Sequence, residues 1–373
     1  MEPFKSAISP DLIKLIASHF ARVVPGFDAA GFAAPLLAQL ESLELKERVI
    51  AVAGALHLAL PTDPAPRAQA LLAVLHPDHD ESFSRPSDEK GLSSWGIWPL
   101  THLVGQHGLG ATERALGTLR EMTKRGTAEF DVRPFIAADP ETALPIISGW
   151  VDDPDHHVRR LVSEGTRPRL PWGMRLQGLV ADPSPMLSVL KKLRDDPSEY
   201  VRRSVANHLN DIAKDHPDLV ADIAQNWMEG ADKNREKLLR HACRTLIKQG
   251  HSGALVAFGF RPPELAASIT LQTPKVTYGE PLGFEVTLRS TSQEPQQLVV
   301  DYIVHHQKAD GSLSPKPFKW TTFTLAPAEA RTLTRSHAIK PITTRRYYPG
   351  EHRLSLRING ADFGDEAFEL LMD

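Results

Sequence analysis

Apolar residues recur every three or four positions along residues 1–262 of the chain. Residues 10–20 and 43–60 follow this spacing closely, and the pattern resumes near Trp95 and again over residues 111–122. Apolar positions spaced in this way form one face of an amphipathic helix. Residues 61–94 interrupt the pattern with Pro, Asp and Ser and are expected to contain a loop. A further helix is expected to begin after Gly126 and end near Ile136, with Thr127 as its cap.

Two segments of this helical region share one sequence pattern, 43 residues apart. The pattern is Asp-Pro followed by Val-Arg-Arg; it occupies residues 153–160 and returns over residues 196–203. A helix is predicted before each copy, over residues 140–150 and 183–193. Units of about 40–47 residues with two helices each are typical of HEAT-like repeats. A weaker third copy aligns residues 239–246 with residues 202–209. Stacked units of this kind form a solenoid with a concave wall.

After Pro262 the hydrophobic pattern changes from a helical period to a two-residue alternation. Residues 267–272, 282–289, 297–304 and 352–358 alternate in this way, with turns at Gly279, Gly311 and Gly350. About seven short strands in about 105 residues indicate an immunoglobulin-like sandwich. The predicted fold class is therefore α + β with two domains: an all-α HEAT-like repeat solenoid over residues 1–262 and an all-β immunoglobulin-like sandwich over residues 266–373.

Charge is unevenly distributed along a chain whose formal net charge is only -3. Residues 158–248 hold about 17 Lys and Arg against about 12 Asp and Glu, whereas the segment before them is acidic. A local basic face is expected of a phosphate-binding surface. The alternative is a solvated helical surface of mixed charge.

The single cysteine and the start of the chain indicate the cellular compartment of the protein. Cys243 has no Cys or His neighbour at metal-binding spacing, so a disulfide framework is excluded and a reducing compartment is expected. The first residues contain no signal-peptide core, and no apolar run reaches membrane length. These features predict a soluble, cytoplasmic protein without a membrane partner.

Familiar catalytic motifs are absent from the sequence. It contains no Walker lysine loop, no His-Glu-x-x-His and no Gly-x-Ser-x-Gly. His156 and His157 are adjacent and point in different directions on a helix, so they are expected at the surface rather than as metal ligands. Trp95 and Trp98 are expected in the core.

Superposing the repeats brings three polar residues to one equivalent position. Glu164 aligns with Asn207 and Arg244, which predicts a polar surface along one face of the solenoid. The loop after Glu164 adds two arginines and Trp172. One interpretation is a functional acid beside an aromatic ring. The other is a structural helix end, where Glu164 pairs with Arg167 and Trp172 packs in the core.

The sequences of this loop and of residues 128–135 resemble a known family. Ser-Glu-Gly-Thr-Arg-Pro-Arg-Leu-Pro-Trp over residues 163–172, Ala-Glu-Phe-Asp-Val-Arg-Pro-Phe over residues 128–135 and the Asp-Pro repeats are similar to the AlkC/AlkD-type DNA alkylation repair glycosylases. A C-terminal sandwich is a feature of AlkC members, so the chain resembles AlkC more than AlkD. The resemblance covers the helical region through about residue 262.

This resemblance implies excision of positively charged alkylated bases from double-stranded DNA. The substrates implied are 3-methyladenine and, in AlkC-like members, 3-methylcytosine, and no metal or redox cofactor is implied. AlkD-like relatives distort the duplex without placing the lesion in a deep pocket, in contrast to base-flipping glycosylases. We expect the protein to act as a monomer.

The residue types independently suit this chemistry. A cationic base is already a good leaving group, so the enzyme must mainly stabilise positive charge on the base and sugar and orient water at C1′. Carboxylates in a partly dried cleft do both, because electrostatic interactions strengthen where water is excluded. The motif contains no lysine for a Schiff base, which predicts a monofunctional glycosylase.

Catalytic roles are assigned from the motif and the repeat alignment. Glu164 and Glu129 are the expected catalytic carboxylates, with Asp211 as a possible third acid or, alternatively, an ordinary surface acid. Trp172 is expected to pack on the sugar or the lesion. Arg160 is expected to brace Glu164, because residues four apart face each other on a helix.

Phosphate binding is assigned to polar and basic residues of the same helices, without sequence preference. They are Arg167, Arg169, Arg203, Asn207, Lys214, Arg240, Arg244 and Lys248. The sandwich offers Lys316, Lys319, Arg345 and Arg346 as further contacts. Two other functions stay open at this point: a non-catalytic binder of distorted DNA and a protein-binding scaffold.

Overall fold

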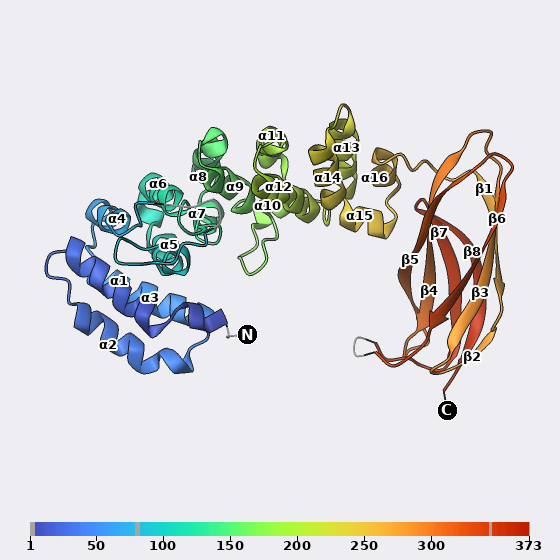
Figure 1. Ribbon diagram of the computed structural model, residues 1–373, viewed down its shortest axis with the longest axis horizontal. Coiled ribbons are helices and arrows are strands. Elements are labelled where there is room, and N and C mark those ends of the chain that lie inside the picture. Colours follow the sequence, from blue (N-terminus) through green and yellow to red (C-terminus); the bar gives the residue numbers. More distant parts are fainter. Residues whose placement is uncertain (1–3, 79–82, 343–344, 373) are drawn as a thin grey trace. The chain divides into compact units, whose positions relative to one another are not determined.

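Helices and then strands follow one another along the chain in the predicted order (Figure 1). The computed structural model describes residues 4–78, 83–342 and 345–372. Helices extend to Ala257 and strands begin at Leu265, so the predicted fold class is confirmed. The chain separates into two compact units, Met1–Asp215 and His216–Asp373, and the last helices belong to the same unit as the strands.

The first unit consists of α-helices and short 3-10 turns. Its α-helices are α1 (Pro10–Val23), α2 (Ala29–Gln39), α3 (Leu45–Ala59), α4 (Pro64–Ala73), α5 (Trp98–His107), α6 (Thr112–Met122), α7 (Arg133–Ala138), α8 (Pro140–Ser148), α9 (His156–Glu164), α10 (Gln177–Ala181), α11 (Ser184–Leu193) and α12 (Glu199–Ile212). The 3-10 turns are η1 (Phe4–Ala7), η2 (Leu40–Ser42), η3 (Ser94–Gly96), η4 (Leu109–Ala111) and η5 (Gly149–Asp152). No helix among the described residues has the length and apolar character needed to span a membrane.

Local sequence explains where many of these helices begin. The side chains of Ser9, Asp28, Asp63, Asp139 and Asp155 each accept a backbone hydrogen bond at the start of the helix that follows. Such caps satisfy amide groups that have no partner inside the helix. Proline occupies the first turn of α1, α4 and α8, where its missing N–H group costs no hydrogen bond.

The repeated Asp-Pro and Val-Arg-Arg pattern connects successive repeats. The first arginine of the motif, Arg159, donates to the carbonyls of its own Asp-Pro and also forms two hydrogen bonds with Asp196 of the next copy, at 2.6 and 3.0 Å. Arg120 on α6 binds Asp153 of the first copy in the same way. Val158 and Val201 are fully buried. The pattern shared by the two copies therefore serves repeat stacking, and only the second arginine is left for another role.

The third copy of the repeat is interrupted. The second unit begins with α13 (Pro217–Met228), α14 (Lys233–Ala242), α15 (Arg244–Gln249) and α16 (Ser252–Ala257). The segment aligned with α12 breaks at Cys243, where ψ is 6° and the helical geometry is lost. Arg244 therefore begins a new short helix and does not continue the face that carries Glu164 and Asn207 in the first two copies.

Eight strands of the described residues form two sheets. They are β1 (Leu265–Leu271), β2 (Lys275–Thr277), β3 (Pro281–Ser290), β4 (Gln296–Gln307), β5 (Leu313–Leu325), β6 (Ala330–Ala338), β7 (Gly350–Ile358) and β8 (Ala361–Leu371). One sheet has the order β1-β3-β6 and the other β2-β8-β7-β4-β5. All neighbours pair antiparallel except β2 and β8. Alternate apolar residues such as Phe284, Val286 and Leu288 fill the space between the sheets.

Side chains of the sandwich donate hydrogen bonds to backbone carbonyls at both ends of residues 249–261, the segment that includes α16. Arg357 donates to the carbonyl of Gln249 at 3.0 Å, and Asn359 donates to the carbonyl of Arg261 at 2.8 Å. Gly360 lies so close to Gly250 that a Cβ atom would stand 2.0 Å from the Gly250 carbonyl oxygen. Both glycines also have positive φ angles, of 74° and 85°, which disfavour other residues. Only glycine fits this junction.

Candidate active site

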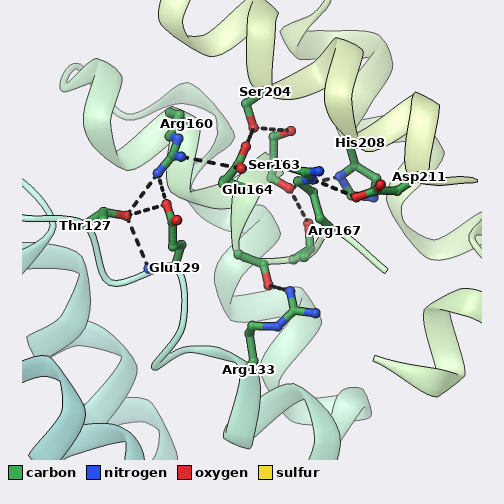
Figure 2. Close-up of polar contacts among 12 residues, drawn as sticks. Thr127, Glu129, Arg133, Arg160, Ser163, Glu164, Arg167, Ser204, His208 and Asp211 are labelled. Atoms are coloured by element: carbon green, nitrogen blue, oxygen red, sulfur yellow. Dashed lines mark hydrogen bonds and ion pairs between the residues drawn. The ribbon is translucent and has the colours of Figure 1, made fainter. Parts of the chain in front are cut away.

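Glu129 and Glu164 lie on either side of the Arg160 guanidinium (Figure 2). Glu129 comes from the loop between α6 and α7, and Glu164 is the last residue of α9. One nitrogen of Arg160 forms a short ion pair with Glu129, and the other lies 3.5 Å from Glu164. The prediction that Arg160 braces Glu164 is confirmed. The same guanidinium also brings the second predicted acid to the site.

Thr127 holds Glu129 from the other side. Its hydroxyl donates to the Glu129 carboxylate at 2.8 Å and accepts from Arg160 at 3.0 Å. It also accepts from the Glu129 backbone amide at 3.3 Å. The prediction that Thr127 caps a helix is wrong, because α7 begins only at Arg133 and has no side-chain cap. The hydroxyl closes a local turn and orients a carboxylate instead.

A second arginine continues the arrangement toward the next repeat. Arg167 donates to Glu164 at 2.6 Å and to Asp211 on α12 at 2.8 Å, and Lys214 donates to Asp211 at 2.9 Å. Acids and bases therefore alternate in one line, which we call the charge chain: Glu129, Arg160, Glu164, Arg167, Asp211 and Lys214. It crosses two repeats, and its formal charges cancel.

Burial and pairing keep the middle of the charge chain ionised. Burial by itself would raise the pKa of Glu164, but Arg160, Arg167 and a hydrogen bond from Ser204 together lower it. Burial would lower the pKa of Arg160, and the charges of Glu129 and Glu164 raise it. The Glu164 carboxylate and the Arg160 guanidinium are therefore ionised near neutral pH.

Arg167 and Asp211 are more deeply buried than predicted. Arg167 is 6% exposed and Asp211 is 2% exposed. The Asp211 alternative of a surface acid is therefore wrong. Arg167, expected at a phosphate, has its guanidinium in the interior between two carboxylates. The structural interpretation of the loop holds for the Glu164–Arg167 pair, but its second half fails because Trp172 is 78% exposed.

A neutral histidine packs behind Glu164. The Nδ1–H group of His208 donates to the carbonyl of Ser163 at 2.9 Å. Burial lowers the pKa of His208 to about 4, with the positive charge of Arg167 as a further cause. Ser204 donates to Glu164 at 2.5 Å. These contacts fix the carboxylate from the side of α12.

Glu129 lines a cleft whose walls are aromatic. The chamber next to Glu129 has a volume of about 500 Å³ and includes Trp95, Trp98, Phe130 and Trp172 in its lining. A second chamber of about 550 Å³ shares the last three of these rings. Glu164 lines neither chamber. The charge chain therefore presents one carboxylate, that of Glu129, to the aromatic cleft.

The prediction that Trp95 and Trp98 belong to the core is wrong. Trp95 is 39% exposed, Trp98 is half-buried, and their ring centroids are 6.2 Å apart. The ring centroid of Phe130 lies 5.7 Å from that of Trp98, and Phe130 completes the aromatic wall. Sequence reasoning counted these rings as core because aromatic side chains dominate protein interiors. The position of Phe130 directly after Glu129 in the sequence was the one sign that aromatic rings line the site.

The second chamber also contains a histidine–carboxylate pair. His102 Nδ1 lies 3.3 Å from Asp131, whose other carboxylate oxygen is buried and has no hydrogen-bond partner among the described residues. Gln106 and Lys46 line the same chamber. No group of three or more His, Cys, Asp or Glu side chains in the described part of the chain is arranged to hold a metal ion.

Arg133 fixes the loop that carries Trp172. Its side chain is fully buried and donates to the carbonyl of Gly165 at 2.8 Å and twice to that of Met174, at 2.8 and 2.5 Å. Burial lowers its pKa to about 10, still high enough to keep it charged at neutral pH. The backbone of Trp172 has a φ of 64°, a conformation that non-glycine residues rarely adopt. A buried cation thus holds the loop that carries the exposed ring.

The remaining candidates for phosphate binding differ in how exposed they are and in whether they already pair with an acid. Arg203 and Lys214 are exposed, whereas Arg169 is half-buried and binds Asp215 through two hydrogen bonds of 2.7 Å. Asn207 is half-buried on α12. In the second unit, Arg240, Arg244 and Lys248 are exposed, and Arg240 pairs with Glu236.

Sequence reasoning missed one basic residue and misplaced one histidine. Arg175 follows the Trp172 loop, is exposed and forms no ion pair with the described residues. It lay just outside the motif. His157, expected at the surface, is 2% exposed and packs against Tyr200 with centroids 5.7 Å apart. Arg160 lies over the same Tyr200 ring, 4.9 Å from its centroid.

Comparisons with known proteins cover the whole chain. An uncharacterised protein from Bacillus subtilis (strain 168), YhaZ, is 35% identical over 373 residues, which is 96% of this chain and 97% of that protein. Residues 265–372 match the family described as the C-terminal Ig-like domain of YhaZ. The solved structure of the Pseudomonas fluorescens alkylpurine DNA glycosylase AlkC, bound to DNA containing an abasic site analog, is similar at a TM-score of 0.79, with 35% identity and 99% of both chains covered.

Proposed function

The chain belongs to the AlkC-type family of HEAT-like repeat DNA glycosylases, and from this premise we propose that it hydrolyses the N-glycosidic bond of cationic alkylated bases in DNA. The proposed substrates are 3-methyladenine and 3-methylcytosine in double-stranded DNA. The observation that carries the proposal is the Glu129 carboxylate, which pairs with Arg160 and lines an aromatic cleft.

The chemistry follows from the charge of the substrate. An alkylated base with a positive charge leaves as a neutral molecule, so the enzyme does not need a strong acid to protonate it. The sugar develops positive charge at C1′ as the bond breaks, and a fixed carboxylate stabilises that charge. The interaction is strong because the cleft excludes part of the water. Glu129 performs this role and orients the attacking water.

Glu164 and Asp211 support this carboxylate from behind. Both are buried, and neither lines the aromatic chambers. Glu164 fixes Arg160, and Asp211 fixes Arg167, so each acid positions the next member of the charge chain. Preorganised groups of this kind lower the reorganisation required in the transition state.

The aromatic side chains bind the lesion or its sugar. Trp172 is 78% exposed and Trp95 is 39% exposed, so both offer ring surface to a ligand. Aromatic faces attract cations. A cationic base or sugar is therefore favoured over a neutral one in the same cleft.

Exposed basic residues bind the DNA backbone. Arg203, Lys214 and Arg175 in the first unit are accessible, and we add Arg175 to the set proposed from sequence. Contacts of this type give affinity without sequence preference and weaken as salt increases.

The expected products are a free base and an abasic strand that stays intact. Cleavage of the strand by a lyase step needs an amine that forms a Schiff base with the sugar. Lys46 lines the second chamber, and no lysine lines the chamber that contains Glu129. Base excision therefore proceeds by hydrolysis alone.

The test is release of labelled 3-methyladenine from methylated duplex DNA by purified protein. Wild type is expected to release the base, and the Glu129→Gln and Glu164→Gln variants are expected to bind DNA but to lose most of the activity. Folded wild type that binds DNA without releasing the base would indicate a non-catalytic relative. Failure to bind DNA at low salt would indicate a protein-binding scaffold.

A further inference from the structure

A separate cavity lies between α4, α5 and α6, and we call it the Arg67 cavity. It has a volume of about 130 Å³, and its lining includes Arg67, His107 and Arg114. No residue lines both this cavity and either chamber of the aromatic cleft. The proposed base excision makes no use of it.

Arg67 is buried without a carboxylate partner among the described residues. It is 9% exposed, donates to the Pro61 carbonyl at 2.7 Å and lies 3.3 Å from Nδ1 of His57. Asp63, one turn earlier, caps α4 by accepting from the Ala65 amide at 3.0 Å and forms no ion pair with Arg67. Buried charged side chains are rare unless they are paired. Its Nε and Nη1 groups have these partners, whereas Nη2 has no hydrogen-bond partner among the described residues and is available to an anion in the cavity.

The groups around Arg67 add a hydrogen-bonding imidazole and a second guanidinium. His107 stacks on His57 with ring centroids 3.6 Å apart. Burial lowers the pKa of His107, and electrostatic interactions with His57, Arg67 and His102 lower it further, so its ring is a neutral hydrogen-bonding group. Arg114 is exposed at the edge of the cavity, and no Asp or Glu belongs to the lining. The cavity is thus rich in hydrogen-bond donors and poor in acids.

The other walls of the Arg67 cavity are apolar. Leu71, Leu103, Val104 and Ala115 contribute side chains to the lining. An engineered apolar cavity of about 150 Å³ is large enough to bind benzene. A single ring or a short branched alkyl group therefore has the appropriate size for this space.

We propose that the Arg67 cavity binds a small carboxylate that carries an aromatic or branched alkyl group. The carboxylate accepts hydrogen bonds from Arg67 and Arg114, because guanidinium groups match planar anions through paired hydrogen bonds. The apolar group packs against Leu71 and Leu103. This ligand class places an anion beside Arg67 and Arg114 and fills the apolar space with one molecule.

The test uses the full chain and four probe ligands. Benzoate and isovalerate are expected to raise the unfolding temperature at millimolar concentration, because a ligand that binds only the folded state stabilises it. Benzamide, which has the ring without the charge, and inorganic phosphate, which has charge without the ring, are expected to have much smaller effects. Isothermal titration gives the dissociation constants.

Variants locate the site. Arg67→Met is expected to abolish the benzoate response, and Arg114→Gln is expected to weaken binding at least about tenfold. Arg114 is exposed, so its replacement keeps the test valid even where Arg67→Met fails to fold. Arg289→Gln, an exposed arginine on β3, is the matched control and should respond as wild type does.

Three results would overturn the proposal. They are no response of wild type to either carboxylate, a response that survives both Arg67→Met and Arg114→Gln, and equal responses to phosphate and benzoate. The last would replace the assigned ligand class with a simple anion. None of these results bears on DNA excision, so the outcome is independent of the proposed function.

Discussion

Glu129 and Glu164 contact the same arginine but have different surroundings. Glu164 is 6% exposed and receives hydrogen bonds from Arg167 and Ser204 in addition to the Arg160 contact. Glu129 lines the cleft and is held by Thr127 and Arg160 alone among the described residues. One acid is therefore placed to meet a substrate and the other to hold the arginine.

Replacing each acid by glutamine should separate these roles. Glu129→Gln should lower single-turnover excision by about 10²–10³-fold, as expected for loss of a group that stabilises transition-state charge. Its free energy of unfolding should fall by less than that of Glu164→Gln, because Glu129 pairs with one arginine whereas Glu164 contacts two. Glu164→Gln should cost about 3 kcal/mol of stability, because one member of a buried ion-pair network is removed. Excision assays and urea unfolding measure the two effects.

The opposite pattern would reverse the assignment. If Glu164→Gln retained full stability while its excision fell more than that of Glu129→Gln, Glu164 would be the carboxylate that meets the substrate. A conservative control is Glu141→Gln on α8, an exposed acid outside the charge chain, which should alter neither quantity.

Trp172 combines an exposed ring with an unfavourable backbone conformation. Its φ of 64° costs roughly 1–2 kcal/mol for a side chain other than glycine. Trp172→Gly should therefore keep or raise the unfolding temperature while it lowers excision. Trp172→Ala keeps the backbone strain and should lose activity without a stability gain. Lower stability in Trp172→Gly would mean that the ring packs more firmly than its 78% exposure indicates.

At the scale of secondary-structure elements, the loop between α9 and α10 depends on one residue of α7. Arg133 makes all three of its hydrogen bonds to backbone carbonyls of this loop, those of Gly165 and Met174. A Cβ atom at Gly173 would stand 3.3 Å from the Arg133 side chain, so the loop packs tightly around it. The loop in turn carries Trp172 to the cleft.

Arg133→Met should loosen this loop. The buried carbonyl of Gly165 loses its donor, at about 1–3 kcal/mol, and the part-buried carbonyl of Met174 loses two. Excision should fall by more than the folded fraction explains, because Trp172 is no longer held in place. Single-turnover rates corrected for the folded fraction measure this effect.

Arg48 provides a matched control for Arg133. It is also buried, at 4% exposure, and donates to the backbone carbonyls of Leu43, Lys5 and Ile8. Arg48→Met should lose comparable stability without a selective loss of excision. Equal effects of the two variants on corrected excision rates would contradict a positioning role for Arg133.

The sandwich contains buried histidines that should make its stability depend on pH. Burial lowers the pKa of His306 to about 3 and that of His337 to about 4. The unfolded chain binds these protons below about pH 6.5, whereas the folded chain does not. Stability should therefore be constant above pH 6.5 and fall as the pH decreases toward 4, by up to about 1.4 kcal/mol per pH unit for each histidine.

Hydrogen exchange of β4 and β7 amides, corrected for intrinsic rates, measures this dependence. His306 has no hydrogen-bond partner on either ring nitrogen among the described residues. His306→Leu should therefore keep or raise stability at pH 7 and reduce the slope between pH 6.5 and 5. An unchanged slope would show that His306 binds its proton as readily in the folded chain as in the unfolded chain.

At the scale of the whole molecule, the two compact units do not divide where the helices end. The units meet between Asp215 and His216, and helices α13 to α16 belong with the sandwich. Arg357 and Asn359 bind backbone carbonyls of the segment just before the strands. The predicted domains, 1–262 and 266–373, follow secondary structure instead.

A chain that ends at residue 264 tests both the boundary and the role of the sandwich. Residues 216–264 should become sensitive to protease, because the strands that they contact are missing. Excision should weaken if the sandwich holds DNA through its basic residues.

Lys316→Gln and Arg346→Gln are milder changes than this truncation, and they should reduce the salt dependence of DNA binding. Unchanged excision and unchanged salt dependence in all three proteins would exclude a DNA-binding role for the sandwich.

Periodicity predicted most of the fold but not its interruptions. The helices at Pro10–Val23 and Leu45–Ala59 and the strands at Pro281–Ser290 and Gln296–Gln307 correspond to predicted segments. The break at Cys243 and the late start of α7 were not predicted. A helical period depends on neighbouring residues, whereas these breaks are set by what the segment packs against.

The sequence by itself determined the repeat, the change from helices to strands and the identity of the acidic motif, because each is written in local order and spacing. Tertiary structure alone decided that Arg167 is buried between two acids, that Trp95 faces a cleft and that Glu129, not Glu164, lines it. Burial and charge pairing depend on contacts between distant segments, and no local pattern of residues encodes them.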